Sequence, residues 1–178
     1  MKTTNLILIG MPGAGKSTVG VILAKRLGYN FIDTDLLIQA QEQCRLQEII
    51  DQRGVEVFRQ IEEQVLLNLK ATRTVIATGG SVIYSQQGVE KIGRAGRLVY
   101  LQVSLDELQR RIADMGQRGL VMNKGQNFAD LYRERTPLYE KFAELTVDCS
   151  ELNAEQVAAE IETQLVSGIL DVFSQFLD

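Results

Sequence analysis

The sequence contains no histidine and only two cysteines among its 178 residues. The absence of histidine excludes histidine general acid–base catalysis, Ser-His triads and histidine-ligated metal sites. The two cysteines, Cys44 and Cys149, are too few for a four-cysteine zinc site and follow no motif spacing. Any chemistry must therefore use carboxylates, lysine, arginine, hydroxyl groups and a bound cation. Phosphoryl transfer suits these groups, because its catalysis consists mostly of positioning and charge stabilisation.

The chain also lacks long apolar runs and an excess of positive charge. No run approaches the length of a membrane span, and residues 1–4 lead straight into a predicted strand, unlike a signal peptide. The net charge of −4 and the pI of about 5.0 argue against general binding to nucleic acid or to a membrane surface. We therefore expect a single cytoplasmic domain, residues 1–178, that binds a small molecule and keeps both thiols reduced.

Residues 10–17, Gly-Met-Pro-Gly-Ala-Gly-Lys-Ser, match the spacing G-x-x-x-x-G-K-[ST] of a phosphate-binding loop. An apolar run at 5–9 predicts a strand before the loop, and the periodicity of 18–27 predicts a helix after it. In such a loop, successive backbone N–H groups point into one concavity, and the helix N-terminus adds its positive dipole end. We expect Lys16 to reach the β- and γ-phosphates and the Ser17 hydroxyl to bind Mg²⁺. The residues expected to contact the nucleoside triphosphate are Gly13, Ala14, Gly15, Lys16, Ser17 and Thr18.

Apolar runs and helical patterns alternate along the whole chain. The runs at 5–9, 30–32, 74–77, 97–103 and 145–148 predict five strands. Helical patterns follow them, over 18–27, from 36, over 46–70 with a break near Gly54, around 86–92, over 104–114, over 128–143 and from 153. This alternation predicts an α/β fold, with a largely parallel sheet and helices on both faces. The apolar tail, 167–178, predicts a helix packed on the domain or a self-association surface.

Two of the predicted strand ends carry residues suited to chemistry, because ligands of open α/β sheets bind outside the carboxyl ends of the strands. Asp33 and Asp35 follow the second strand, where they either direct a metal ion and a substrate or simply cap the next helix. Beside a phosphate loop, we favour the first interpretation. Gly79 and Gly80 follow the third strand, where they either allow a close approach of the backbone to a ligand or to a neighbouring element, or form a plain turn.

Arg59 lies in the predicted helix after Gly54, three residues before Glu62. The two side chains are spaced to form a surface ion pair, worth about a few tenths of a kcal/mol. Alternatively, Arg59 points into the ligand crevice and binds a carboxylate, for which its planar guanidinium is suited.

Residues 115–126 interrupt the helical pattern with three glycines and with the basic residues Arg118 and Lys124. A dozen such residues inside a compact domain predict a functional loop. In an enzyme that transfers phosphate, this function is a mobile lid that excludes water and brings an arginine to the transferring phosphoryl group.

Together these segments resemble the shikimate kinases, which are small members of the nucleoside-monophosphate-kinase-like P-loop enzymes. The resemblance covers residues 5–165 and rests on the phosphate loop, on Phe31-Ile32-Asp33-Thr34-Asp35, on Phe58-Arg59-x-Ile61-Glu62 and on Arg135-x-Pro137-Leu138-Tyr139. It implies a three-layer α/β/α fold with five parallel strands in the order 2-3-1-4-5. Within a core at 5–166, the substrate-binding region is expected at about 33–62 and the lid at about 115–126. The implied enzyme is a monomer that transfers the γ-phosphoryl group of ATP to the 3-hydroxyl of shikimate, with Mg²⁺ as cofactor.

The resemblance also implies roles in phosphoryl transfer for residues that match the family by position. Lys16 and Arg118 would stabilise charge on the transferred group, and both would contact ATP. Ser17 would bind Mg²⁺ directly, and Asp33 would help to hold the ion through water. Asp35 would accept a hydrogen bond from the attacking hydroxyl and act as its base.

For the acceptor, the resemblance implies a carboxylate site made by Arg59, Arg135 and the backbone N–H groups of Gly79 and Gly80. Asp35 would complete the substrate contacts. On the nucleotide side, Arg111 would lie against the adenine, with the loop at 149–154 closing over it.

Two segments depart from the family's pattern, and both lie on the acceptor side or its cover. Residues 78–81 are Thr-Gly-Gly-Ser where three glycines are usual, and residues 118–121 are Arg-Gly-Leu-Val where Arg-Pro-Leu-Leu is usual. Two alternatives therefore stay open. A kinase of another small hydroxy acid, such as gluconate, would not need both Arg59 and Arg135. An inactive shikimate-kinase-like binding protein should have lost at least one of the residues named above.

Overall fold

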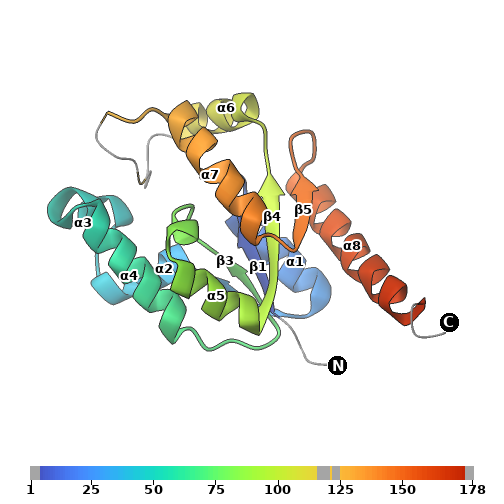
Figure 1. The fold of residues 1–178 in the computed structure, drawn as a ribbon. Helices are drawn as coiled ribbons and strands as arrows, with labels where there is room; N and C mark the ends of the chain where they lie inside the picture. The colour runs from blue at the N-terminus through green and yellow to red at the C-terminus, as the bar shows by residue number, and fades with distance from the viewer. Residues whose placement is uncertain (1–4, 116–120, 122–124, 175–178) are drawn as a thin grey trace.

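Five parallel strands form the centre of the computed structural model, which describes residues 5–115, 121 and 125–174 (Figure 1). The strands are β1 (Asn5–Ile9), β2 (Asn30–Asp33), β3 (Thr74–Ala77), β4 (Gly96–Gln102) and β5 (Leu145–Asp148), in the order β2-β3-β1-β4-β5. Each neighbouring pair is parallel, and Ile7 of β1 lies in register with Ile76 of β3 and Leu98 of β4. The predicted parallel sheet and its strand order are therefore confirmed.

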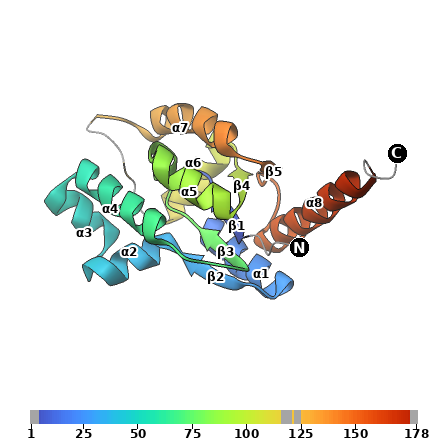
Figure 2. The ribbon, with the colours of Figure 1, turned by 60° about the horizontal axis from the view of Figure 1, so that its bottom comes forward.

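Helices cover both faces of this sheet (Figures 1 and 2). On one face, α1 (Lys16–Leu27) and α8 (Ala154–Ser174) pack against each other; the other face carries α5 (Gln86–Ala95) and α7 (Phe128–Phe142). Beside the β2 edge lie α2 (Thr34–Glu42), α3 (Leu46–Arg53) and α4 (Val55–Asn68). A 3₁₀ helix, η1 (Val82–Tyr84), follows β3, and α6 (Leu105–Met115) follows β4. The three-layer arrangement is the one that the resemblance implied.

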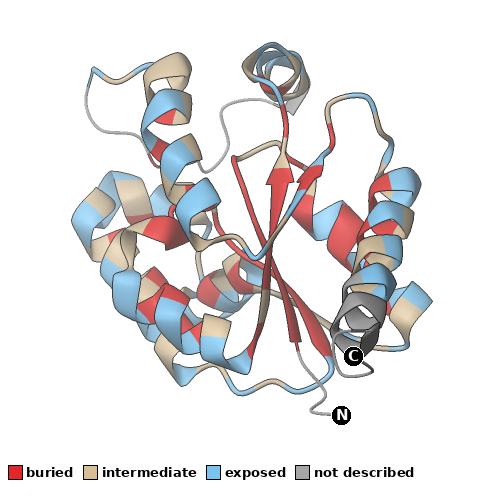
Figure 3. Cartoon of the chain, turned by 45° about the vertical axis from the view of Figure 1, so that its right-hand side comes forward, coloured by how far each residue is buried: buried red, intermediate tan, exposed pale blue. Residues whose placement is uncertain are grey.

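The apolar core divides into two clusters. The larger lies between the sheet and its covering helices, and every residue of β1 is buried, because a parallel sheet is covered on both faces (Figure 3). The smaller lies among α2, α3 and α4 and consists of Ile38, Ile49, Phe58, Val65 and Val121. Val121, which belongs to the segment expected to form the lid, packs in the core of the substrate-binding helices.

The helix boundaries follow local sequence signals. The break predicted near Gly54 separates α3 from α4, and Gly54 adopts a φ of 83°, which favours glycine. The pattern over 128–143 forms a single helix, α7, with Pro137 inside it. The backbone of α8 extends to Ser174, so most of the tail at 167–178 is helical. The side chains from 168 onward are not among those that the structure describes. No helix in the described part of the chain combines the length and the apolar composition needed to cross a bilayer.

Candidate active site

The loop at 10–15 joins β1 to α1 in the geometry of a phosphate cradle. Gly15 occupies the position before the first turn of α1 with a φ of 90°, which side chains other than glycine rarely adopt. The N-terminus of α1 thus points into the loop, and no acidic residue lies in its first turn to compete for an anion. The arrangement fits the phosphates of a nucleoside triphosphate.

The side chain of Lys16 folds back onto this loop. Its ammonium group donates to the carbonyl oxygens of Gly10 at 2.7 Å and of Met11 at 2.9 Å. Burial lowers the pKa of Lys16 to about 8, while the nearby carboxylates of Asp35 and Asp33 act in the opposite direction. The group therefore stays largely protonated at neutral pH, and phosphate oxygens would give it stronger partners than the two carbonyls.

Asp33 caps the next helix and also contacts the phosphate loop; a role in holding a metal ion stays a prediction. One carboxylate oxygen accepts from the backbone N–H groups of Asp35 at 2.9 Å and Leu36 at 3.4 Å, which caps α2. The other accepts from the hydroxyl of Ser17 at 2.6 Å. Hydroxyl and carboxylate oxygens are the hard ligands that Mg²⁺ prefers. Ser17 and Asp33 thus form a fitting, if incomplete, ligand pair for Mg²⁺.

No cluster of three or more potential metal-ligating carboxylate or thiol side chains occurs within the described ranges. A metal ion at Ser17 and Asp33 would therefore take its remaining ligands from phosphate and water. Mg²⁺ commonly binds in this way, through one or two carboxylates, substrate phosphates and several waters.

Asp35 and Glu62 bring two carboxyl groups close to the backbone after β3. A Cβ atom added to Gly79 would lie 2.3 Å from Glu62 Oε1 and 2.8 Å from Asp35 Oδ1. Any side chain at position 79 would therefore displace one of the carboxyl groups. The backbone therefore comes close to neighbouring elements, one of the possibilities that the paired glycines offered, and its approach to a ligand stays a prediction.

Burial, together with the negative charge of Asp33, raises the pKa of Asp35 to about 6. Burial likewise raises the pKa of Glu62 to about 7, while a hydrogen bond that Ser81 donates at 2.7 Å favours the ionised form. Two carboxyl groups with displaced pKa values beside a phosphate loop mark a functional site. Asp35 was predicted to belong to it, whereas Glu62 was not.

The backbone at Gly79 and Gly80 is partly engaged by neighbouring side chains. The N–H group of Gly79 donates to the Thr34 hydroxyl at 3.3 Å, and the carbonyl oxygen of Gly80 accepts from the Tyr139 hydroxyl at 2.5 Å. A substrate would therefore reach the Gly79 amide only by replacing the bond to Thr34. The interpretation of Gly80 as a donor to the substrate stays a prediction.

Arg59 and Arg135 converge on one aromatic ring, that of Tyr84. The guanidinium carbon of Arg59 lies 4.4 Å from the ring centroid, and that of Arg135 lies 5.2 Å from it. Arg135 is fully buried, and it donates to the Tyr84 hydroxyl at 3.2 Å and to the Val121 carbonyl at 2.6 Å. The two arginines that the resemblance assigned to a carboxylate are thus neighbours in space, although 76 positions apart in the chain.

The suggested ion pair between Arg59 and Glu62 is wrong. Arg59 instead pairs at 3.1 Å with Glu56, which is 80% exposed, whereas Glu62 is buried against Ser81. Both spacings are three residues, but Glu62 lies on the inward face of α4 and Glu56 on the outward face. The more specific alternative for Arg59, a carboxylate anchor in the crevice, gains support from its place beside Arg135.

Four buried polar atoms of this site have no hydrogen-bond partner within the described ranges: Asp35 Oδ1, Glu62 Oε1, Arg59 Nε and Arg135 Nη1. Two of them are donors on cations and two are carboxyl acceptors. Buried polar atoms without partners are costly in a folded protein, so that a set of them indicates a place for a polar ligand. The set fits a molecule that carries both an anionic group and hydroxyl groups.

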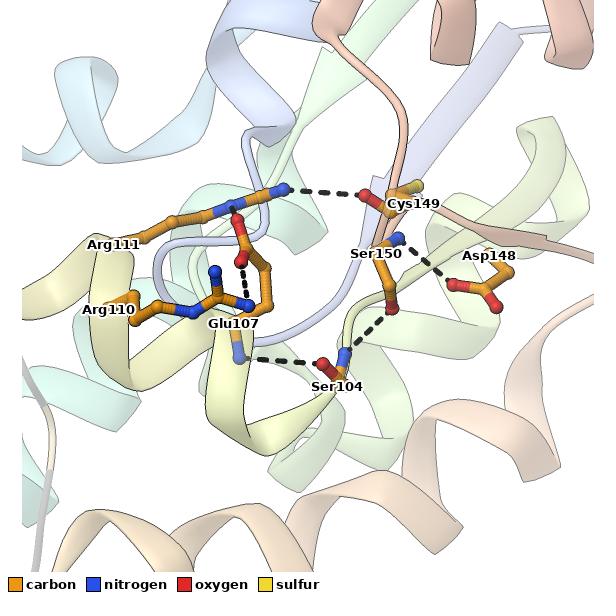
Figure 4. A network of polar contacts seen from close by, with 7 residues as sticks. All are labelled: Ser104, Glu107, Arg110, Arg111, Asp148, Cys149 and Ser150. Carbon is orange, nitrogen blue, oxygen red and sulfur yellow. Dashed lines mark hydrogen bonds and ion pairs between the residues drawn. The ribbon is translucent and has the colours of Figure 1, made fainter.

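Arg111 lies at the other end of the phosphate loop, in a polar network between α6 and the loop after β5 (Figure 4). It donates to Glu107 at 2.8 Å and to the carbonyl oxygen of Cys149 at 3.3 Å. Ser104, at the start of α6, donates its N–H group to Ser150 at 3.1 Å. Arg111 therefore contacts the loop at 149–154 through the carbonyl oxygen of Cys149. Contact with an adenine stays a prediction.

Arg118 and Lys124 fall outside the described residues, so that the structure says nothing of the predicted lid arginine. Of the segment 115–126, the contact of Val121 with Arg135 is described, as is a hydrogen bond of 2.6 Å from Gln126 to Glu134. The two thiols are free: Cys44 is half-buried and Cys149 is buried. Burial raises the pKa of the Cys149 thiol to about 12, which leaves it protonated and unreactive.

The family model for shikimate kinase matches residues 12–166. A shikimate kinase of Synechococcus sp. (strain RCC307) is 39% identical over 169 residues, which cover 93% of this chain and 86% of the relative. The chain belongs to the shikimate kinase family. Members of this family are ATP-dependent phosphotransferases that act on an alcohol group of shikimate, so the predicted enzyme class and the prediction of ATP are confirmed.

Solved structures support the same conclusion. The structure of a shikimate kinase from Acinetobacter baumannii in complex with shikimate has a TM-score of 0.86 at 32% identity and covers 94% of this chain and 96% of its own. A gluconokinase from Sinorhizobium meliloti has a TM-score of 0.53 at 17% identity over 98% of both chains. The second likeness shows a shared fold alone, and it does not favour gluconate as the acceptor.

Proposed function

We propose that this chain transfers the γ-phosphoryl group of ATP to the 3-hydroxyl of shikimate, giving shikimate 3-phosphate and ADP. The observation that carries the proposal is the set of unpartnered atoms of Asp35, Glu62, Arg59 and Arg135, defined above for the described residues. Shikimate carries one carboxylate and several hydroxyl groups, which complement two cationic donors and two carboxyl acceptors. This acceptor site lies beside the phosphate loop: Cβ atoms added to Gly79 and Gly80 would touch Asp35 and the loop residue Pro12.

Asp35 is the residue that we assign to the attacking hydroxyl. It lies at the start of α2, where Asp33 caps the helix and thereby fixes the backbone of Asp35. A pKa of about 6 leaves the Asp35 carboxylate mostly ionised at neutral pH, yet basic enough to take a proton during the reaction. In this role it accepts a hydrogen bond from the acceptor hydroxyl, orients the oxygen toward the phosphate and receives its proton.

Lys16 and Ser17 are the residues that we assign to the phosphate. Lys16 exchanges the carbonyl oxygens of Gly10 and Met11 for phosphate oxygens and stabilises charge on the transferring group. Ser17 would hold Mg²⁺ directly and Asp33 would hold it through water. When bound, this ion neutralises phosphate charge. Arg118, from outside the described residues, is proposed as a second cation at the transferred group.

The binding of the acceptor carboxylate is assigned to Arg59 and Arg135. Both have an unpartnered N–H donor within the described part of the site, and a carboxylate is the anion that suits a planar guanidinium. The protein as a whole has a net charge of −4, so two local cations are needed to attract an anionic acceptor. Binding energy from this remote group would hold the hydroxyl in line with the phosphate.

The proposal is tested by measuring ADP release from purified protein with ATP and Mg²⁺ in the presence of shikimate, gluconate or a panel of nucleoside monophosphates. We expect shikimate alone to stimulate ADP release above the background ATPase rate. Stimulation by gluconate instead would assign the other acceptor, and the absence of any stimulation would support an inactive relative.

A further inference from the structure

Tyr84 occupies the centre of the acceptor site without any signal in the sequence that it belongs there. It is the last residue of η1, between β3 and α5. The guanidinium groups of Arg59, from α4, and Arg135, from α7, both lie over its ring, at 4.4 and 5.2 Å from the centroid. Three separate elements thus meet at one aromatic side chain.

The hydroxyl of Tyr84 holds Arg135 in a fixed orientation. It accepts a hydrogen bond from Arg135 Nε at 3.2 Å and donates one to Glu134 Oε1 at 2.5 Å. Arg135 Nη2 is held by the Val121 carbonyl oxygen at 2.6 Å. Because two of its donors are held, Arg135 Nη1, which has no partner in the described part of the chain, points in a fixed direction.

Arg59 has few other constraints. Its ion pair is with Glu56, which is 80% exposed, and such a pair holds a long side chain weakly. Its Nε atom is buried and has no partner among the described residues. The face of an aromatic ring attracts a guanidinium group by about 0.5–2 kcal/mol, most strongly where water is excluded. The ring of Tyr84 is therefore the principal contact that keeps Arg59 near Arg135.

The guanidinium groups of the buried Arg135 and the partly exposed Arg59 repel each other. The described residues provide no carboxylate within ion-pair distance of Arg135, and Glu62 is directed toward Ser81. The ring of Tyr84 lowers the energy of both cations without neutralising either of them. Glu62 and Glu134 act on both arginines from a distance, but Arg59 Nε and Arg135 Nη1 have no partner among the described residues and can bind an anion that comes from outside.

We propose that Tyr84 is a positioning residue for the acceptor carboxylate: its ring and hydroxyl hold Arg59 and Arg135 as a preformed pair of cations. Tyr84 itself does not touch the reacting atoms. The inference rests on the proposed function, because it takes shikimate as the source of the carboxylate. It adds a residue that determines specificity for an anionic acceptor, and it predicts that substitution at Tyr84 weakens acceptor binding without slowing the chemical step.

The test compares Tyr84→Leu, which removes the ring, with Tyr84→Phe, which removes the hydroxyl alone. We expect Tyr84→Leu to raise the KM for shikimate by about an order of magnitude and Tyr84→Phe to raise it by about two- to fivefold. The kcat and the KM for ATP should stay within about twofold of the wild-type values in both variants. If Tyr84→Leu does not fold, Tyr84→Met replaces the ring with a flexible side chain and takes its place.

Tyr29 provides a matched control, because its ring also lies beneath a guanidinium group, that of Arg73, at 5.5 Å. Neither residue belongs to the acceptor site, so Tyr29→Leu should leave the KM for shikimate unchanged. The methyl ester of shikimate lacks the negative charge. Comparing it with the acid shows whether Tyr84 acts by positioning the two arginines or only by filling space. Tyr84→Leu should weaken binding of the acid and leave the weaker binding of the ester unchanged, as measured by calorimetric titration.

Two results would overturn the role of Tyr84: an unchanged KM for shikimate in Tyr84→Leu, or an equal loss of affinity for acid and ester. The second result would mean that the ring only fills space. Failure of the proposed function has a different signature. If the wild-type protein does not phosphorylate shikimate but binds it with an affinity that depends on Tyr84, the function fails while the positioning role holds.

Discussion

The hydroxyl of Ser17 lies 2.6 Å from a carboxylate oxygen of Asp33, which joins the first turn of α1 to the end of β2. The contact places a residue of the phosphate loop beside the residue that caps α2, and Asp35 lies in the first turn of that helix. The nucleotide side and the acceptor side of the site are therefore built on the ends of β1 and β2, which flank β3 in the sheet. Asp33 takes part in both the proposed metal site and the cap of α2. A suitable substitution at Asp33 should therefore impair metal binding without destabilising α2.

Asp33→Asn should impair the response to Mg²⁺ and preserve the fold. Asparagine still caps a helix, but its neutral amide oxygen is a weaker ligand for Mg²⁺ than a carboxylate. We expect the Mg²⁺ concentration for half-maximal activity to rise by about tenfold, with little change in the melting temperature. The control is Asn127→Ala, which removes the cap of α7 and should cost about 1 kcal/mol without changing the Mg²⁺ response. An unaltered Mg²⁺ response in Asp33→Asn would remove Asp33 from the metal site.

Asp35→Asn should abolish phosphoryl transfer while ATP binding persists. The substitution keeps the size of the side chain and removes its ability to take a proton, a contribution of about 10²–10⁴-fold in rate. Turnover and nucleotide affinity are measured on the same preparation, with Asp106→Asn, on the exposed first turn of α6, as the control. Turnover at the wild-type rate would contradict the assignment of Asp35 as base and orienting group.

Glu107→Gln should raise the KM for ATP by about three- to tenfold and leave the KM for shikimate unchanged. Glu107 accepts from Arg111 at 2.8 Å, and this pair fixes the guanidinium that we expect against the adenine. Arg110→Ala is the matched control, because Arg110 pairs with the other oxygen of Glu107 but is 76% exposed. Equal effects of the two substitutions would show that the whole network, rather than the position of Arg111, governs nucleotide binding.

Glu62→Gln should remove part of the pH dependence of stability. Burial raises the pKa of Glu62 from 4.5 to about 7, with Asp35, Arg59, Arg135 and Ser81 as its charged and hydrogen-bonding neighbours. Between these pH values the folded state holds a proton that the unfolded state has released, so stability falls as the pH rises through this window. Glutamine cannot ionise, and relative to wild type the variant should gain stability between pH 4.5 and pH 7, by an amount on the order of 2–3 kcal/mol.

The measurement is the free energy of unfolding in urea at pH 5 and pH 8, for wild type, Glu62→Gln and Glu63→Gln. Glu63 is the neighbouring residue on α4 and is partly exposed, so Glu63→Gln controls for the loss of one negative charge. A difference between wild type and Glu62→Gln that is the same at both pH values would show that Glu62 ionises normally in the folded protein.

Most of the fold followed from local patterns in the sequence. The strand runs, the phosphate loop and the break at Gly54 depend on near neighbours in the chain, and each was confirmed. The order of the strands required the family resemblance, because periodicity does not determine which strands pair. The phosphate side of the site was equally accessible, since Lys16 and Ser17 lie in one contiguous motif.

The acceptor side was less predictable, because it is assembled from distant segments. Arg59 has a glutamate three residues away on each side, and spacing alone does not decide which of them it pairs with. Glu62 lies on the inward face of α4 and is buried against Ser81, whereas the exposed Glu56 pairs with Arg59. Tyr84 carries no motif, and its importance arises from α4 and α7 meeting over one ring.

The central claim is that this chain places a phosphoryl group on the 3-hydroxyl of shikimate. The most direct measurement is phosphorus and proton NMR of the product formed from shikimate, ATP and Mg²⁺ by the purified protein. We predict a single phosphate ester at the 3-position, formed in equal amount to ADP. A phosphate ester at another hydroxyl, or inorganic phosphate as the only product, would contradict the account.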